Sequence, residues 1–213
     1  MSVIQLYDPI AETYSEVAER SLYAGPQWLG ANLPIHMKVQ PARIADLACA
    51  NGLLGKILRH RFPQAEIVGV DVTPRMIEQA RESGVYDKLI VHDLNEPIRP
   101  HLNPEFDLIV GLGFSEFLKH PPDLLKCLSG LLSKQGVAMF SFQEYLPSDP
   151  KRAPRTTRSG EVIHNAYSRN EVEMMFHDAG LHLLNLERIV GYQGGGGFLC
   201  LYLMAIASRT TLL

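Results

Sequence analysis

The sequence predicts an α/β protein with a doubly wound, Rossmann-like sheet that is mostly parallel, has helices on both faces and ends in a C-terminal antiparallel β-hairpin. Short apolar segments alternate with helical patterns from residue 44 onward, as expected for repeated βα units. The first apolar segment ends in a turn of small residues, and the second ends in Asp71. The last two apolar segments are separated only by residues 191–197. That linker is too short for a helix, so the two segments should pair as antiparallel strands.

Residues 1–40 are expected to form a helical lid. Apolar and aromatic side chains recur at helical spacing over residues 9–22, and the pair Gly25-Pro26 is expected to end that helix. A second helix is expected over residues 28–39. It should stop before Pro41, because the residue that precedes a proline disfavours helical dihedral angles.

Residues 41–143 carry the alternating pattern and are expected to form a cofactor-binding core. Thr73 and Pro74 indicate a helix start, with the threonine hydroxyl as the cap and proline in the first turn. The expected strands are residues 44–48, 66–70, 89–92, 107–112 and 136–142, and the expected helices are residues 52–61, 73–82 and 122–132.

The C-terminal part is expected to hold a substrate flap over residues 144–168, followed by a helix and a hairpin over residues 169–213. The helix should cover residues 169–179 and end at Gly180, and the hairpin strands should cover residues 182–190 and 198–208. The whole chain, residues 1–213, is then one domain. The flap carries four basic residues, Lys151, Arg152, Arg155 and Arg158. They indicate either a solvated loop or a site that attracts a carboxylate or phosphate of the substrate.

The composition excludes several classes of protein. With 46% hydrophobic and 20% charged residues, the chain is globular rather than disordered or fibrous. A net charge of −3 gives no reason to expect nucleic acid or an anionic membrane as a partner. No two His or Cys residues have metal-ligand spacing, so we expect no metal. The three cysteines form no CxxC pair, and we find neither a secretory signal nor an apolar segment of ~20 residues. We therefore expect a cytoplasmic protein.

The turn after the first strand and the acid after the second predict a site for an adenosine-containing cofactor. Small residues at the turn let the backbone approach a ligand, and Asp71 lies about 20 residues farther on, where an acid accepts hydrogen bonds from ribose hydroxyls. Other motifs follow in a fixed order. They are Asp46-Leu-Ala48-Cys-Ala50-Asn-Gly52, then His92-Asp93-Leu94, then Phe106-Asp-Leu-Ile-Val-Gly111, with Tyr7-Asp8 and Tyr14 near the N-terminus.

Taken together, these motifs resemble those of the class I S-adenosylmethionine-dependent methyltransferases that act on small molecules. The resemblance implies S-adenosylmethionine as the cofactor, with its ribose on Asp71 and its adenine near Asp93. It implies that Asp46 and the Gly111 backbone face the methionine end, and that Tyr14 closes the lid. The implied cofactor-binding residues are Tyr14, Asp46, Ala48, Ala50, Gly52, Asp71, Val72, Met76, Asp93, Leu94 and Gly111.

The sequence departs from the family pattern at two places. Ala48 and Ala50 occupy turn positions where glycine is usual, and their Cβ atoms add bulk where the backbone approaches the ligand. The fourth strand is followed by Gly111-Leu-Gly113-Phe114-Ser115-Glu116. Family members that methylate nucleobase or amide nitrogens often have Asn/Asp-Pro-Pro-Tyr/Phe there, so this segment argues against those reactions.

The residues expected to line the substrate site lie after the fourth and fifth strands and in the hairpin. A positioned histidine can remove a proton from the acceptor, and His164 is the candidate for this catalytic role. The alternative is a histidine that only packs or faces solvent. The substrate-binding candidates are Phe114, Glu116, Tyr145, Tyr167 and Tyr192.

The expected function is in-line transfer of a methyl group to an O, C or N nucleophile of a small molecule. If this molecule carries an anionic group, the basic flap would help to attract it. One alternative is a protein of the same fold that binds S-adenosylmethionine without transferring its methyl group. The other is an NAD-dependent oxidoreductase, which is disfavoured because the turn lacks G-x-G-x-x-G. The sequence does not assign an oligomeric state.

Overall fold

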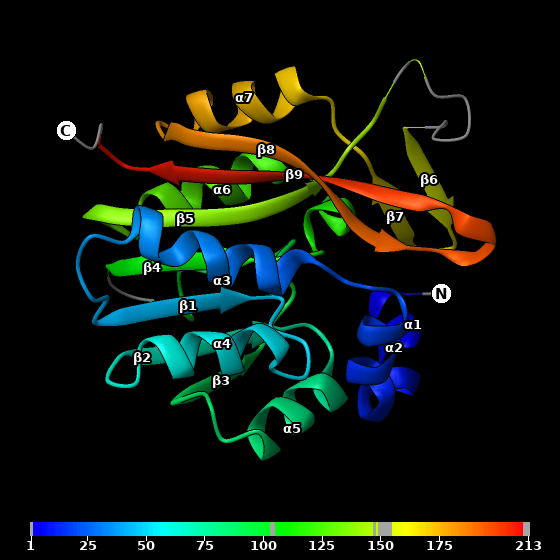
Figure 1. The fold of residues 1–213 in the computed structure, drawn as a ribbon, viewed down its shortest axis with the longest axis horizontal. Coiled ribbons are helices and arrows are strands. Elements are labelled where there is room, and N and C mark those ends of the chain that lie inside the picture. Colours follow the sequence, from blue (N-terminus) through cyan, green and yellow to red (C-terminus); the bar gives the residue numbers. More distant parts are fainter. Residues whose placement is uncertain (1, 103–104, 147, 149–154, 211–213) are drawn as a thin grey trace.

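The computed structural model describes residues 2–102, 105–146, 148 and 155–210. Its main sheet has seven strands in the order β3-β2-β1-β4-β5-β9-β8 (Figure 1). Strands β1 to β5 pair in parallel, and β9 pairs antiparallel with both β5 and β8. The predicted fold class is therefore confirmed. The bounds are β1 Arg43–Leu47, β2 Glu66–Asp71, β3 Lys88–Val91, β4 Phe106–Gly111, β5 Leu132–Gln143, β8 His182–Gln193 and β9 Leu199–Ser208.

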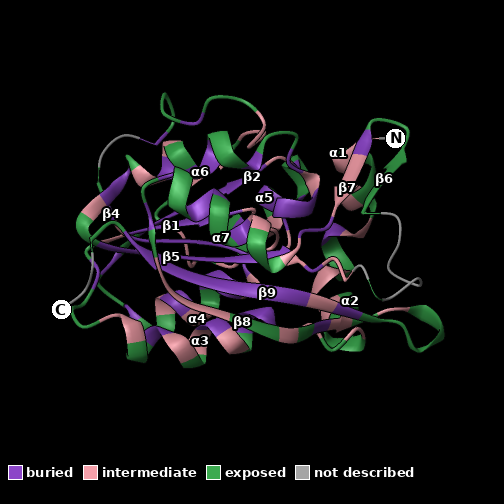
Figure 2. Ribbon diagram, turned by 90° about the horizontal axis from the view of Figure 1, so that it is seen from above, coloured by how far each residue is buried: buried purple, intermediate pink, exposed green. Residues whose placement is uncertain are grey.

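Helices cover both faces of this sheet. Figure 2 shows α3 and α4 on one face and α6 and α7 on the other. Successive side chains of a strand point to opposite faces, so Ile44 of β1 packs with Leu29 of α3, while Ala45 packs with the cluster that holds Leu125 and Phe176. The helix bounds are α1 Val3–Tyr7, α2 Tyr14–Arg20, α3 Gly25–His36, α4 Leu53–Arg61, α5 Pro74–Glu82, α6 Pro121–Ser129 and α7 Arg169–Asp178, with 3-10 turns η1 Asp8–Thr13, η2 Ser115–Phe117 and η4 Gly195–Gly197. None of the helices in these described residues is long and apolar enough to cross a membrane.

The N-terminal region differs from its prediction. Residues 9–22 do not form one α-helix: they are divided between the 3-10 turn η1, which has Pro9 in its first turn, and α2, which begins at Tyr14. The pair Gly25-Pro26 begins α3 rather than ending a helix, with proline in the favoured first turn. In α3, Leu29 and Leu33 are fully buried against the sheet. Because α3 packs on the sheet, the N-terminal segment that is free to form a lid ends before Gly25 and is shorter than the predicted lid of residues 1–40.

A second sheet lies inside the region predicted as a flap. Strands β6 Thr156–Ser159 and β7 Val162–Asn165 form an antiparallel hairpin whose turn has Gly160 at φ 64°. We missed this hairpin in the sequence. Ser-Gly between two β-branched segments is a hairpin signal, because glycine adopts positive φ without strain.

Two further predicted details are wrong. The Thr73 side chain makes no capping hydrogen bond with the first turn of α5; instead its backbone N–H donates to Asp71, 2.8 Å away. Strand β8 continues to Gln193, so only a short turn around η4 separates it from β9. A Cβ atom on Gly191 would overlap Cδ2 of Tyr202, so glycine at this position lets the tyrosine ring pack across the hairpin.

Candidate active site

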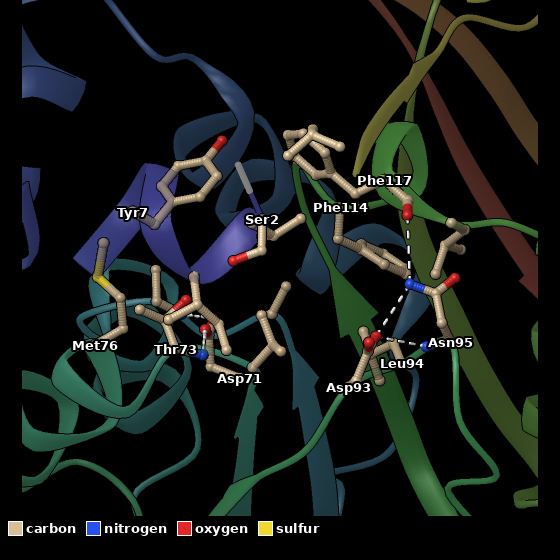
Figure 3. A pocket seen from close by; sticks show the side chains of 18 of the residues that line it. Ser2, Tyr7, Asp71, Thr73, Met76, Asp93, Leu94, Asn95, Phe114 and Phe117 are labelled. Atoms are coloured by element: carbon tan, nitrogen blue, oxygen red, sulfur yellow. Dashed lines mark hydrogen bonds between the residues drawn. The ribbon is translucent and has the colours of Figure 1, made fainter. Parts of the chain in front are cut away.

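A cavity of about 240 Å³ opens at the carboxyl ends of β1 to β4. This is the edge at which open α/β sheets bind ligands. Helix α1 and the β6–β7 hairpin line its other sides, as Ser2 and Tyr7 from α1 and its cap illustrate (Figure 3). We refer to it as the first cavity. Eight predicted cofactor residues come together there: Tyr14, Ala48, Ala50, Asp71, Val72, Met76, Asp93 and Leu94.

The small-residue turn has the backbone that glycine usually supplies. Ala48 and Ala50 adopt φ 54° and 46°, in the left-handed region. A hydrogen bond of 2.9 Å from the Ala50 N–H to Oδ2 of Asp71 holds the turn against the end of β2. Alanine keeps its Cβ in this strained conformation, which costs roughly 1–2 kcal/mol.

Ala50→Gly should therefore raise the free energy of unfolding by about 0.5 to 1 kcal/mol, because relief of strain exceeds the entropy that glycine adds to the unfolded chain. Urea denaturation measures this difference. Ala31→Gly is the control, since Ala31 is an exposed residue inside α3, where the same change should destabilise by about 0.5 to 1 kcal/mol. Destabilisation of both variants would contradict the strain argument.

Asp71 is a buried acid that the backbone already holds in place. Only 7% of its surface is exposed, and its two carboxylate oxygens accept the N–H groups of Ala50 and Thr73. Burial raises the pKa of Asp71, although hydrogen bonds from Thr73 and Ala50 oppose the shift. The backbone thus fixes the orientation of this carboxylate at the wall of the first cavity, where a ligand hydroxyl can donate to it.

Asp93 is fixed by a neighbour that we did not single out in the sequence. Its Oδ1 accepts from the backbone N–H of Asn95 at 2.9 Å and from Asn95 Nδ2 at 3.0 Å. Asn95 in turn accepts the N–H of Lys119 at 2.7 Å and donates to the Phe117 carbonyl (Figure 3). The segment after β3 is thus linked to the one after β4, and the Asp93 carboxylate is held at the wall of the first cavity.

Three predicted cofactor residues are not among the described residues that line the first cavity. Asp46 is buried beneath the turn, where Tyr86 donates a hydrogen bond of 2.7 Å to its Oδ2; burial raises the pKa of Asp46 to about 7. Gly52 precedes α4 with φ 90°. A Cβ on Gly111 would lie 2.5 Å from Cε1 of Phe114, so this glycine makes room for that ring.

A second cavity, of about 360 Å³, adjoins the first. The two cavities share Tyr7, Tyr14, Gly113 and Phe117. Of the predicted substrate residues, Glu116 and Tyr192 line the second cavity, as does His164, while Phe114 lines the first. A molecule in the second cavity would therefore lie next to a cofactor in the first.

Tyr145 and Tyr167 are not among the described residues that line either cavity. Tyr167 is buried, and its hydroxyl donates to the Ser115 carbonyl at 2.9 Å, which fixes η2. The N–H of Tyr145 pairs with the Tyr167 carbonyl at 2.8 Å. These tyrosines therefore lie behind the turn that carries Glu116, where they position it.

Glu116 is the one acid among the described residues that line the second cavity. Its side chain is 4% exposed and accepts a hydrogen bond of 2.9 Å from the Tyr202 hydroxyl. Burial raises the pKa of Glu116. His164 is half-buried, packs edge-on against Phe117, and has its pKa lowered by burial. It is therefore neutral at pH 7, the state that a base requires.

The two described basic residues of the predicted flap, Arg155 and Arg158, do not line these cavities. Arg155 pairs with Glu171, and Arg158 is exposed on β6. Lys151 and Arg152 lie outside the described residues. The described part of the flap thus gives no charge complement to an anionic substrate.

Comparison with known proteins identifies the domain. Residues 45–138 match a family model described as a methyltransferase domain. The chain is 30% identical over 152 residues to demethylmenaquinone methyltransferase of Thermotoga maritima, an alignment that covers 70% of this chain and 64% of the relative. A malonyl-[acyl-carrier protein] O-methyltransferase of Legionella pneumophila is 28% identical over 63% of this chain and 45% of its own. The chain thus spans less than two thirds of each relative.

Solved structures share the fold at low sequence identity. A methyltransferase from Haloferax volcanii, solved in complex with the Trm112 methyltransferase activator, has a TM-score of 0.76 and 16% identity, over 100% of this chain and 99% of that one. An S-adenosylmethionine-dependent methyltransferase from Clostridium acetobutylicum has a TM-score of 0.68 and 17% identity, over 92% and 98%. Residues 45–138 thus resemble a methyltransferase domain, and the fold of the chain is that of solved S-adenosylmethionine-dependent methyltransferases.

Proposed function

We propose that this protein binds S-adenosylmethionine in the first cavity and transfers its methyl group to a small molecule in the second. The observation that supports this most is the geometry of Asp71. Its carboxylate lies at the end of β2 beside a turn of small residues, is held by the N–H groups of Ala50 and Thr73, and lines the first cavity.

The other lining residues fit an adenosine-containing ligand. Met76 and Leu94 supply apolar surface for a flat ring, and Asp93 supplies an acceptor that Asn95 holds in place. Ala48 and Ala50, the two turn residues in the cavity, each carry only a methyl side chain, so the backbone can still approach the ligand closely. The bound cofactor supplies a methyl group that its sulfonium charge already activates.

The task of the protein is then to position the acceptor and exclude water. The second cavity adjoins the first through Tyr7, Tyr14, Gly113 and Phe117, so it is the place for the acceptor. His164, neutral at pH 7, is our candidate base for an acceptor that must lose a proton. The relatives are named for acting on demethylmenaquinone and malonyl-[acyl-carrier protein], which are too different to select one substrate. A cytoplasmic location remains our expectation from cysteine usage.

Calorimetric titration with S-adenosylmethionine, S-adenosylhomocysteine and NADH tests the proposed cofactor. We expect micromolar binding of both sulfur compounds and none of NADH. Formation of S-adenosylhomocysteine in the presence of small-molecule acceptors then tests methyl transfer. Substrate turnover that leaves S-adenosylmethionine unconsumed would support a reaction other than methyl transfer, and binding of NADH alone would replace the proposal with an oxidoreductase.

A further inference from the structure

We propose that the second cavity recognises a small amine, whose ammonium group pairs with the carboxylate of Glu116 and lies against the tyrosine rings around it. This inference rests on the proposed function, because it names the class of acceptor that the methyltransferase takes. The ammonium form binds, and before its nitrogen can attack the methyl group it must give up a proton, for which His164 in the same cavity is the candidate base. The inference rests on three features of the described residues: the burial of Glu116, the charges of the cavity and the aromatic side chains of its wall.

Glu116 has hydroxyl partners but no cationic one among the described residues. The Tyr202 hydroxyl donates to Oε1 at 2.9 Å, and the Ser115 hydroxyl lies 3.4 Å from Oε2. No ion pair with Lys, Arg or His involves Glu116 in the described part of the chain. A buried carboxylate without a cation is costly, so a cationic ligand would supply the missing partner.

The described lining of the second cavity has no Lys or Arg side chain that would favour an anionic ligand. Among its described residues, Glu116 is the one acid. The His164 pKa is lowered by burial, so this ring adds no positive charge at pH 7. The potential of the second cavity is therefore negative or neutral, in contrast to the anionic substrate expected from the basic flap.

The wall around Glu116 is aromatic. Ring centroids of Tyr7 and Phe117 lie 5.9 Å apart, those of Phe117 and His164 5.4 Å, and those of Tyr192 and Tyr202 6.1 Å. Aromatic faces attract alkylammonium groups electrostatically through the ring quadrupole. A carboxylate at one side and tyrosine rings at the others form a site with the chemistry that an ammonium group requires.

The experiment compares three probes of similar size and different charge: phenethylamine, 2-phenylethanol and 3-phenylpropionate. Each is titrated calorimetrically into the protein at pH 7, with and without saturating S-adenosylhomocysteine. We expect phenethylamine to bind at least tenfold tighter than the alcohol, and the carboxylate to bind weakest. An amine that binds no tighter than the alcohol in either condition would overturn the inference.

Glu116→Gln keeps the size of the side chain and removes its charge. We expect it to weaken phenethylamine at least tenfold and to leave the affinities for 2-phenylethanol and S-adenosylhomocysteine unchanged. Glu16→Gln is the control, because Glu16 is an exposed acid on α2 that pairs with Arg20; it should change none of the three. If Glu116→Gln instead weakens S-adenosylmethionine alone, Glu116 serves the cofactor and the amine site is refuted. Failure of S-adenosylhomocysteine to bind the unaltered protein would count against the proposed function only.

Proton release gives an independent readout. Burial raises the pKa of Glu116, whereas a bound ammonium group favours its carboxylate form, so any proton exchanged at Glu116 on binding will make the binding heat vary with the ionisation enthalpy of the buffer. This variation should vanish in Glu116→Gln; its persistence would place the proton on another group and count against the proposal. The other titratable groups that face Glu116 are Tyr7, Tyr14, Tyr23, Tyr167, Tyr192, Tyr202 and His164.

Discussion

Replacing Asp71 with alanine should abolish binding of S-adenosylhomocysteine and lower the free energy of unfolding by about 3 kcal/mol. Both effects follow from one carboxylate. Its oxygens accept the N–H groups of Ala50 and Thr73 at 2.9 and 2.8 Å, and each such bond to a charged group contributes about 1.5 to 3 kcal/mol. Without them the Ala50 turn is released from β2, and the proposed acceptor for the ribose is lost as well. Calorimetry and urea denaturation measure the two effects.

The chain offers a matched control at the opposite edge of the sheet. Asp107, in β4, also accepts two backbone N–H groups, from Ala42 at 2.8 Å and Arg43 at 3.2 Å, and a hydroxyl from Ser133. Asp107→Ala should therefore destabilise the fold by a similar amount and leave the affinity for S-adenosylhomocysteine intact below its melting temperature. Equal affinities of the Asp71 and Asp107 variants would remove Asp71 from the cofactor site.

The position of Asp71 could be predicted because the residues that surround it are close to it in the sequence. One strand, one turn and the next strand determine where the acid lies, and their apolar pattern can be read directly from the sequence. The same reasoning could not identify the hydrogen-bond partner of Asp46. The position of Asp46 in β1 was predicted correctly, but its partner is Tyr86, which is 40 residues away in the sequence. A pattern of apolar residues does not tell which polar side chain will meet a buried carboxyl group.

The second cavity was harder still to predict. Glu116, Tyr23 and Tyr202 come from three separate parts of the chain and meet only when β9 lies beside β5 and α3 packs on the same face. The sequence pattern predicted the antiparallel position of β9. It did not predict that the Tyr202 ring would pack over Gly191 and reach Glu116, because this depends on the register of the β8–β9 hairpin, which contains two irregularities.

Asp46 should make the stability of the protein fall as the pH rises from 4 to 8. Burial raises its pKa from 3.8 to about 7. A carboxyl group whose pKa is higher in the folded state stabilises the fold below its unfolded pKa, and this contribution is lost as the pH passes through the folded value. Three pKa units correspond to about 4 kcal/mol. Asp46→Asn stays neutral and can still accept the Tyr86 hydrogen bond, so it should be the more stable protein at pH 8 and lose this pH dependence.

Urea denaturation of the unaltered protein and of Asp46→Asn at pH 5 and pH 8 measures how the free energy of unfolding of each changes with pH. The difference between the two changes isolates the contribution of Asp46 from that of the other buried acids. Asp87 is the control of opposite sign. Its burial is outweighed by hydrogen bonds from the Ile67 N–H and Arg59, so its pKa is lowered. Its contribution is therefore complete above pH 5. Asp87→Asn should destabilise equally at both pH values and leave the slope unchanged. If Asp46→Asn keeps the slope of the unaltered protein, Asp46 is already ionised below pH 5. It must then gain stabilisation beyond the single Tyr86 hydrogen bond.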